Sequence, residues 1–187
     1  MLVSSLPGET ESFGGGVIFV RNTLKALQDI ARKYRKACRD LTVVGITGSN
    51  GKTSTKDFLA SVLEQAGGVS GTAGNLNNHI GVPLTVLSTA PDSRFGVWEM
   101  GMNHSGEIEV LTEIAAPDAA VITHIGTAHI EHLETRDAIA EEKSQLPRAV
   151  PGDGYCVMPC RDDYYEYMAG AVDCEMIPVG GENGRVR

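Results

Sequence analysis

A short glycine-rich stretch carries the clearest chemistry in the sequence. Residues 47–53 read Thr-Gly-Ser-Asn-Gly-Lys-Thr and follow the apolar run 42–46 directly. In such a turn glycines let backbone N–H groups face phosphate oxygens, and a helix that begins there adds partial positive charge. Lys52 can reach the terminal phosphates, and the hydroxyl of Thr53 can bind Mg²⁺. The plain alternative is a tight turn with a surface lysine; we favour a nucleotide or other polyphosphate ligand.

A carboxylate ends a second apolar run. Residues 95–99 read as a strand whose last residue is Glu99. A hard cation that bridges phosphates needs an oxygen ligand close to the Thr53 hydroxyl. Taken alone, an acidic residue at a strand end is more often an ordinary surface residue. With the phosphate loop upstream, we predict that Glu99 binds the cation.

Three histidines follow a third apolar run, 119–124, which ends at the first of them. His124, His129 and His132 lie within nine residues of one another. No cysteine is near them in the sequence, which argues against a closed zinc site. Two interpretations stay open here: one imidazole contributes to a catalytic cation site, or the histidines only cap a loop.

Lys143 occupies an unusual place in a predicted helix. It shares a stripe with Ile139 and Leu146, at helical spacings of four and three, so its amine points to where the helix packs. In one interpretation the stem follows the apolar stripe and the amine reaches water. In the other, desolvation lowers the amine pKa and leaves a neutral nucleophile. Such an amine can take up CO₂ as a carbamate, which is a metal ligand.

These side chains must be positioned by elements that alternate along the chain. Apolar runs predict strands at 42–46, 95–99, 119–124, 155–158 and 175–179, and helical periodicity predicts helices at 53–66, 106–115, 136–146 and 162–171. The first of these helices is expected to turn inward Phe58, Leu59, Val62 and Leu63. The alternation predicts an α/β fold, with a mainly parallel sheet and helices on both faces. In such sheets ligands bind beyond the carboxyl ends of the strands.

Composition bounds the class of protein. The chain has 187 residues, 42% of them hydrophobic, and its 24 acidic and 16 basic side chains give a net charge of −8. This predicts a globular protein and argues against non-specific binding to nucleic acid, which depends on Lys and Arg. We see no secretion signal and no apolar run long enough to span a membrane. We therefore expect a cytoplasmic protein whose four cysteines are buried thiols.

Three stretches resemble a known family. Residues 45–56, Gly-Ile-Thr-Gly-Ser-Asn-Gly-Lys-Thr-Ser-Thr-Lys, resemble the ATP-binding loop of the Mur ligases, which also lacks a glycine at the position of Ile46. Residues 74–85 and 99–108 are similar to signatures of F-type members, and residues 23–28 resemble the connector between their first two domains. The resemblance runs from about residue 17 to the end of the chain.

The resemblance implies a P-loop-containing central domain of a Mur ligase and an ATP-driven ligation in peptidoglycan precursor synthesis. The γ-phosphate would pass to the terminal carboxylate of UDP-N-acetylmuramoyl-tripeptide, and the amine of D-alanyl-D-alanine would attack the acyl phosphate. By matching position, Thr53 and Glu99 would bind a first Mg²⁺, and a second would lie between Glu99, His129 and carbamylated Lys143. The catalytic residues would be Lys52, Glu99, His129 and Lys143. ATP would contact Thr47, Gly48, Ser49, Asn50, Gly51, Lys52, Thr53 and Ser54, and the substrates Asn75, Asn77, Asn78, Asn103 and His104.

Family members have three domains, which leads to a prediction of domain organisation. Residues 1–40 are expected to be the end of the N-terminal domain and a linker helix, and residues 41–187 the ATP-binding central domain, with the C-terminal domain absent. We expect a monomer that binds ATP without turnover in isolation, since ligation needs the closed site. The alternatives are a Mur-like ligase of the folylpolyglutamate or cyanophycin synthetase type, and a nucleotide-binding module without catalysis of its own.

Overall fold

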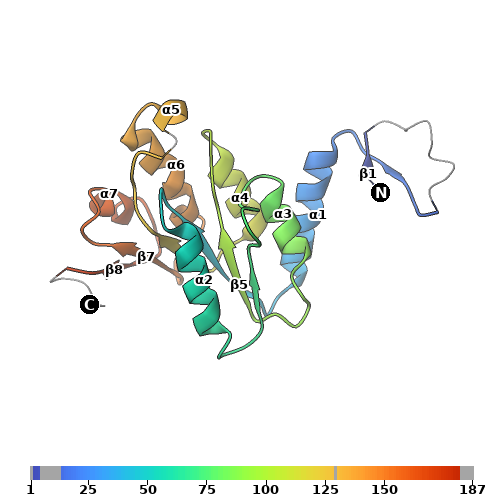
Figure 1. The fold of residues 1–187 in the computed structure, drawn as a ribbon, viewed down its shortest axis with the longest axis horizontal. Helices are drawn as coiled ribbons and strands as arrows, with labels where there is room; N and C mark the ends of the chain where they lie inside the picture. The colour runs from blue at the N-terminus through green and yellow to red at the C-terminus, as the bar shows by residue number, and fades with distance from the viewer. Residues whose placement is uncertain (1, 5–13, 129, 182–187) are drawn as a thin grey trace.

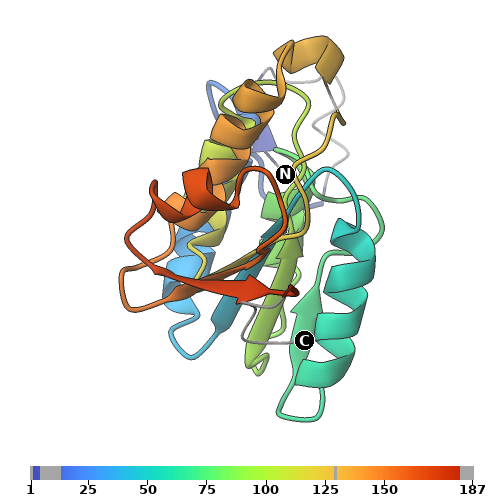
Figure 2. The ribbon, with the colours of Figure 1, turned by 90° about the vertical axis from the view of Figure 1, so that its left-hand side faces the viewer.

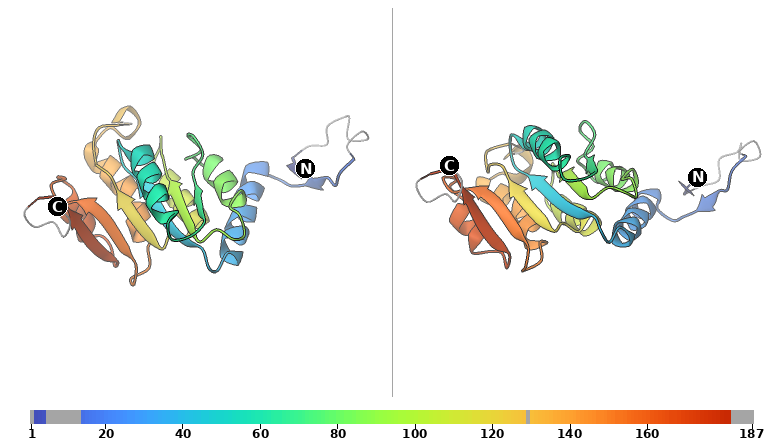
Figure 3. Two further views of the ribbon diagram at one scale, coloured as in Figure 1. Left: turned by 60° about the horizontal axis from the view of Figure 1, so that its bottom comes forward. Right: turned by 90° about the horizontal axis from the view of Figure 1, so that it is seen from below.

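The computed structural model describes residues 2–4, 14–128 and 130–181. Its main sheet has six parallel strands in the spatial order β4-β5-β3-β6-β7-β8. Their bounds are β3 (Thr42–Thr47), β4 (Val69–Gly71), β5 (Phe95–Glu99), β6 (Ala119–Ile122), β7 (Tyr155–Pro159) and β8 (Glu175–Val179). A separate parallel pair, β1 (Leu2–Val3) and β2 (Ile18–Phe19), projects from the end of the molecule opposite β8 (Figures 1 and 3).

Helices cover both faces of this sheet, as the sequence predicts. They are α1 (Thr23–Ala37), α2 (Lys52–Leu63), α3 (Gly81–Leu87), α4 (Glu107–Ala115), α5 (Ile130–Leu133), α6 (Arg136–Arg148) and α7 (Tyr165–Ala169). Figure 2 shows α2 on one side of the sheet, while α1, α4 and α6 lie on the other. The predicted α/β fold class is confirmed. No described helix is long and apolar enough to cross a membrane.

Alternate residues of the central strand β3 face the two helical layers. Val44 and Ile46 pack toward α2, and Val43 belongs to the larger core on the opposite face. Gly45 shares that second face, and a Cβ built on it would lie 2.6 Å from Cδ1 of Leu146. Helix α6 therefore packs close to the central strand. Because crossover helices run antiparallel to the strands, Lys143, one turn before Leu146, lies nearer their carboxyl ends.

The predicted inward face of α2 is partly wrong. Leu59 and Leu63 pack against the sheet, but the side chains of Phe58 and Val62 are 75% and 67% exposed. The stripe that packs has the spacing i, i+3, i+4, i+7 and begins at Lys56. Phe58 and Val62 lie outside that stripe. Lys56 and Ala60 lie on it instead.

Other bounds differ at the ends of elements. The predicted strand 119–124 ends at Ile122, and the predicted helix 162–171 is shorter, since α7 spans Tyr165–Ala169. Strand β4 and helices α3 and α5 were not predicted, because each is short and lacks clear periodicity. The four cysteines are free thiols, but Cys38 and Cys160 are only partly buried.

Helix α1 is tied to the sheet by a buried arginine. Arg35 donates from Nε to the carbonyl of Ala115 at 2.8 Å and from Nη2 to that of Ala116 at 2.9 Å. Its Nη2 also lies 3.0 Å from Oδ2 of Asp118, which accepts the N–H of Val43 at 2.7 Å. Arg35 thus links α1 to the amino ends of β3 and β6.

Candidate functional site

The phosphate loop lies at the edge of the sheet where the helices that follow neighbouring strands pack on opposite faces. Strand β3 leads into α2 on one face, whereas its neighbours β5 and β6 lead into helices on the other face. Adjacent connections that leave in opposite directions open a crevice beyond the carboxyl ends of the strands. Residues 48–51 lie in this crevice, between β3 and the start of α2.

Two glycines give the loop its shape. Gly48 has φ of +147°, and a Cβ built on it would lie 1.9 Å from Oγ1 of Thr123, so a larger residue does not fit. Gly51 has φ of +80° and stands at the N-cap of α2, where no side chain caps the helix. The backbone donors that begin α2 are therefore not occupied by a capping side chain, which suits an anionic ligand.

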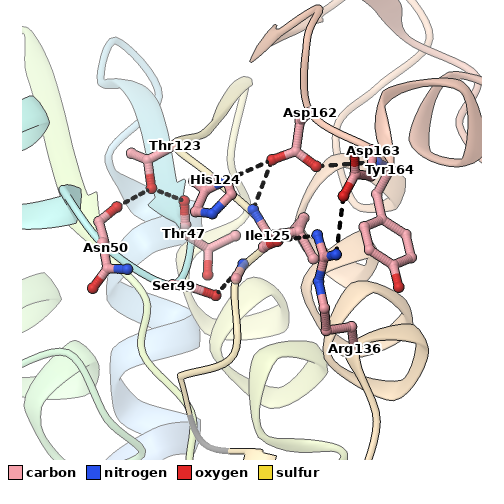
Figure 4. A network of polar contacts seen from close by, with 11 residues as sticks. Thr47, Ser49, Asn50, Thr123, His124, Ile125, Arg136, Asp162, Asp163 and Tyr164 are labelled. Atoms are coloured by element: carbon pink, nitrogen blue, oxygen red, sulfur yellow. Dashed lines mark hydrogen bonds and ion pairs between the residues drawn. The ribbon is translucent and has the colours of Figure 1, made fainter.

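The loop rests on a wall formed by the segment after β6 (Figure 4). The N–H of Ser49 donates to the carbonyl of His124 at 2.8 Å, and the N–H of Gly126 donates to Oγ of Ser49 at 2.8 Å. Asp162, from the loop after β7, accepts the N–H of Ile125 at 2.9 Å and lies 2.8 Å from Nδ1 of His124. Three strand ends are thus joined by direct hydrogen bonds around the phosphate loop.

The two described histidines of this stretch, His124 and His132, have different neighbours. His124 belongs to the wall, which matches the loop-capping interpretation for that residue. The ring of His132, on α5, packs 4.9 Å from that of His104, and His129 lies outside the described residues. Within the part of the chain that the structure describes, no group of three or more His, Cys, Asp or Glu side chains is arranged to hold a metal ion.

Glu99 is the centre of the candidate cation site. Its side chain is almost fully buried, and Oε2 accepts the hydroxyl of Thr53 at 2.9 Å. Oε1 accepts Nδ2 of Asn77 at 2.8 Å, and the backbone N–H donates to Oγ1 of Thr72 at 2.9 Å. Adjacent ligands of octahedral Mg²⁺ with bonds of about 2.1 Å lie about 3 Å apart. The Thr53 and Glu99 oxygens therefore have the spacing that such a cation requires.

Lys52 folds back over the loop. Its Nζ donates to the carbonyl of Gly48 at 2.9 Å. Burial lowers the pKa of this amine, and the nearby Glu99 carboxylate acts in the opposite direction. A phosphate in the loop would add negative charge beside the amine and favour its protonated form.

A hollow of about 270 Å³ opens beside Lys52, on the β5 side of the loop. It is lined by Lys52, Asn75, Asn77, Asn78, His79, Gly101, Met102, Asn103 and Glu107. Four of the five predicted substrate residues thus share one surface. The fifth, His104, is not part of this lining; its N–H donates to Oε2 of Glu107 at 3.2 Å.

Lys143 is 1% exposed, so the interpretation in which its amine reaches water is wrong. Burial lowers the pKa of the amine to about 7, with a further contribution from the charge of Lys52. The Glu142 carboxylate raises it by a smaller amount. A large fraction of the amine is therefore neutral near pH 7, which a nucleophile requires.

Glu142 is a functional candidate that the sequence analysis missed. It is buried, and its two carboxylate oxygens accept the N–H groups of Gly106 at 2.8 Å and Ile108 at 2.7 Å. These are backbone donors at the start of α4, the helix that follows Asn103 and His104. Glu142 thus connects the helix of Lys143 to the loop that borders the hollow.

Removing the Glu142 carboxylate should destabilise the domain. We expect Glu142→Ala to lower the free energy of unfolding by about 2 to 4 kcal/mol, because the buried N–H of Ile108 and the partly buried N–H of Gly106 lose their acceptor. Urea denaturation measures this. The neighbouring exposed residue provides the control: Glu141→Ala, which loses a surface ion pair with Arg148, should lose less than about 1 kcal/mol. Equal losses for the two variants would contradict the capping role.

Comparisons with known proteins agree with this geometry. A sequence model of the Mur ligase middle domain matches residues 46–184. The UDP-N-acetylmuramoyl-tripeptide--D-alanyl-D-alanine ligase of Bacillus subtilis is 45% identical over 153 residues, which are 82% of this chain and 33% of that protein. This chain therefore spans about a third of the length of that relative.

Solved structures give the same result. The crystal structure of MurF from Acinetobacter baumannii superposes with a TM-score of 0.89 at 33% identity, over 98% of this chain and 40% of that one. MurF ligase from Thermotoga maritima, in complex with ADP, superposes with a TM-score of 0.83 at 29% identity, over 96% of this chain and 41% of that one. The chain belongs to the Mur ligase family, whose middle domain it contains.

Proposed function

We propose that this chain is the ATP-binding domain of a ligase that joins D-alanyl-D-alanine to UDP-N-acetylmuramoyl-tripeptide during peptidoglycan precursor synthesis. The observation that carries the proposal is the Thr53 and Glu99 oxygen pair, 2.9 Å apart, between the phosphate loop and an amide-lined hollow. The names of the most similar relatives support the choice of substrates. The proposal places the protein in the cytoplasm as a monomer.

The nucleotide would be held by the loop and by α2. Backbone N–H groups of residues 50–53 would surround its phosphates, since the N–H of Ser49 already donates to the carbonyl of His124, and the Lys52 ammonium would hold the β- and γ-phosphates. Thr53 and Glu99 would hold one Mg²⁺, while Glu99, His129 and a carbamate on Lys143 would hold a second. When bound, these cations offset the repulsion between triphosphate and substrate carboxylate.

The hollow would orient the acyl substrate. Asn75, Asn78 and Asn103 present amide groups that can donate and accept hydrogen bonds without adding charge. The substrate carboxylate would thereby face the γ-phosphate beside Lys52. The carboxylate would take up the γ-phosphoryl group as ADP leaves, and the amine of D-alanyl-D-alanine would then attack the acyl carbon and displace inorganic phosphate. Orientation of this kind is a large part of the catalytic effect in two-substrate reactions.

Carbamylation of Lys143 is supported by its burial and its lowered pKa. With ¹³C-bicarbonate and Mg²⁺ we expect a new carbamate resonance in the NMR spectrum of the wild-type chain. The signal should be absent from Lys143→Met and kept in the control Lys33→Met, which removes an exposed amine. An ordered, unmodified amine at this position in a metal-bound crystal structure would refute the carbamate.

Ligation is tested in a polypeptide that joins this domain to the two flanking domains of the family. We expect phosphate release from ATP that requires both UDP-N-acetylmuramoyl-tripeptide and D-alanyl-D-alanine. Turnover with a folate-type acyl substrate instead would favour the other Mur-like ligases. If the polypeptide binds ATP but no acyl substrate stimulates phosphate release, the domain would be a nucleotide-binding module without catalysis of its own.

A further inference from the structure

A second lysine of α2, Lys56, has no part in the proposed reaction yet is 8% exposed. Its Nζ donates to the carbonyl of Thr72 at 2.9 Å, and it lies 2.9 Å from Oδ1 of the exposed Asp57. Leu59, Ala60 and Leu63 continue the same stripe into the apolar core. A leucine at position 56 would pack there without the desolvation cost of an ammonium group. Packing alone therefore does not explain a lysine at this position.

The residue that Lys56 binds also holds the candidate cation ligand. Thr72 follows β4, is buried, and continues the ladder by donating its N–H to the carbonyl of Val97 at 3.2 Å. Its Oγ1 accepts the N–H of Glu99 at 2.9 Å. Two hydrogen bonds, with Thr72 between them, thus connect the Lys56 ammonium to the backbone of Glu99.

This connection closes a frame around the cation site. Thr53 and Lys56 are one turn apart on α2. Thr53 meets the Glu99 carboxylate directly, while Lys56 fixes the Glu99 backbone through Thr72. Helix α2 therefore sets the distance between the two oxygen ligands, and a charge-assisted bond to a carbonyl is strong and directional enough to hold it.

We propose that Lys56 is a positioning residue for the cation site: by anchoring Thr72, it holds the Glu99 carboxylate where a divalent cation bound with a nucleotide needs it. The same anchor fixes the start of the loop that brings Asn77 to Oε1 of Glu99. The inference rests on the proposed function for the identity of the ligand, Mg²⁺ with ATP. The hydrogen-bonded chain itself does not depend on that identity.

The test separates cation binding from nucleotide binding. ATP affinity of this chain is measured by calorimetry in EDTA and over a Mg²⁺ titration. For Lys56→Met we expect the Mg²⁺ concentration at half-maximal enhancement to rise about tenfold or more, as for other residues that orient a metal ligand. Affinity in EDTA should change less than twofold. Lys56→Arg should restore part of the Mg²⁺ response, and Lys33→Met, which removes an exposed lysine of α1, should behave as wild type.

A second variant keeps the test decisive if Lys56→Met does not fold. Valine has nearly the same shape as threonine, so Thr72→Val removes only the acceptor of the Glu99 N–H. We expect this variant to need more Mg²⁺, as Lys56→Met does, and to show faster hydrogen exchange at the Glu99 amide. The positioning role would be overturned if the folded variants respond to Mg²⁺ as the wild type does. It would also be overturned if they lose the same ATP affinity in EDTA as in Mg²⁺. Absence of ATP binding in the wild-type chain would instead refute the proposed function, and exchange at Glu99 would still test the anchor.

Discussion

Lys52→Ala is expected to weaken ATP binding by about 100-fold, or about 3 kcal/mol, which is the size of a charge-assisted hydrogen bond to phosphate together with the lost ionic attraction. The wild-type amine already lies over the loop, 2.9 Å from the carbonyl of Gly48. Little reorganisation is therefore needed when phosphates enter. Calorimetric titration of the purified chain with Mg²⁺ and ATP measures the loss.

The effect should be local to the phosphates. Inorganic tripolyphosphate should lose as much affinity as ATP does, since in the proposed role Lys52 would hold the phosphates and not the base or ribose. The control Lys25→Ala removes an exposed lysine of α1 that pairs with Asp29 and should leave the affinity unchanged. Wild-type affinity in Lys52→Ala would remove the basis for the phosphate-loop assignment.

The phosphate loop and the fold could be read from the sequence because both depend on local patterns. The glycines, Lys52 and Thr53 are adjacent in the chain, and their strand-loop-helix context is visible as an apolar run followed by helical periodicity. Glu99 could be predicted because it ends an apolar run, and because the carboxyl ends of parallel strands lie at the same edge of a sheet. Lys143 was found because a lysine interrupts an apolar stripe.

The supporting residues could not be read in this way. The contacts of Glu142 with Gly106 and Ile108 span more than 30 residues, and no spacing rule relates them. Thr72 holds Glu99 because of the pairing between β4 and β5, and β4 is too short to be recognised. One sequence signal points to Lys56: it precedes Leu59, Ala60 and Leu63 at helical spacing, and these three pack against the sheet, whereas Phe58 and Val62 of the predicted face are exposed.

The buried amine of Lys143 should make the stability of the domain depend on pH. Its pKa is about 7 in the folded state and 10.5 in the reference state without burial. Between these values the unfolded chain binds a proton that the folded chain does not, so the free energy of unfolding rises with pH. Below pH 7 both states are protonated, and the folded state carries the full cost of a buried ammonium. The two pKa values put that cost on the order of 5 kcal/mol, as an upper bound.

Lys143→Met removes this cost and should therefore stabilise the domain while abolishing the proposed carbamate. We expect a gain of roughly 2 to 5 kcal/mol at pH 6 that falls from about pH 7 upward and vanishes near pH 10.5, measured by urea denaturation in CO₂-free buffer. The groups that act on this amine are Lys52, which lowers its pKa, and Glu142, which raises it. Lys33→Met should show no such pH-dependent gain.

Bicarbonate with Mg²⁺ should then stabilise the wild type but not Lys143→Met, because only the wild type can exchange a buried cation for a metal-bound anion. A pH-independent difference between the variants would show that Lys143 is not neutral when buried, and the route to the carbamate would fail with it.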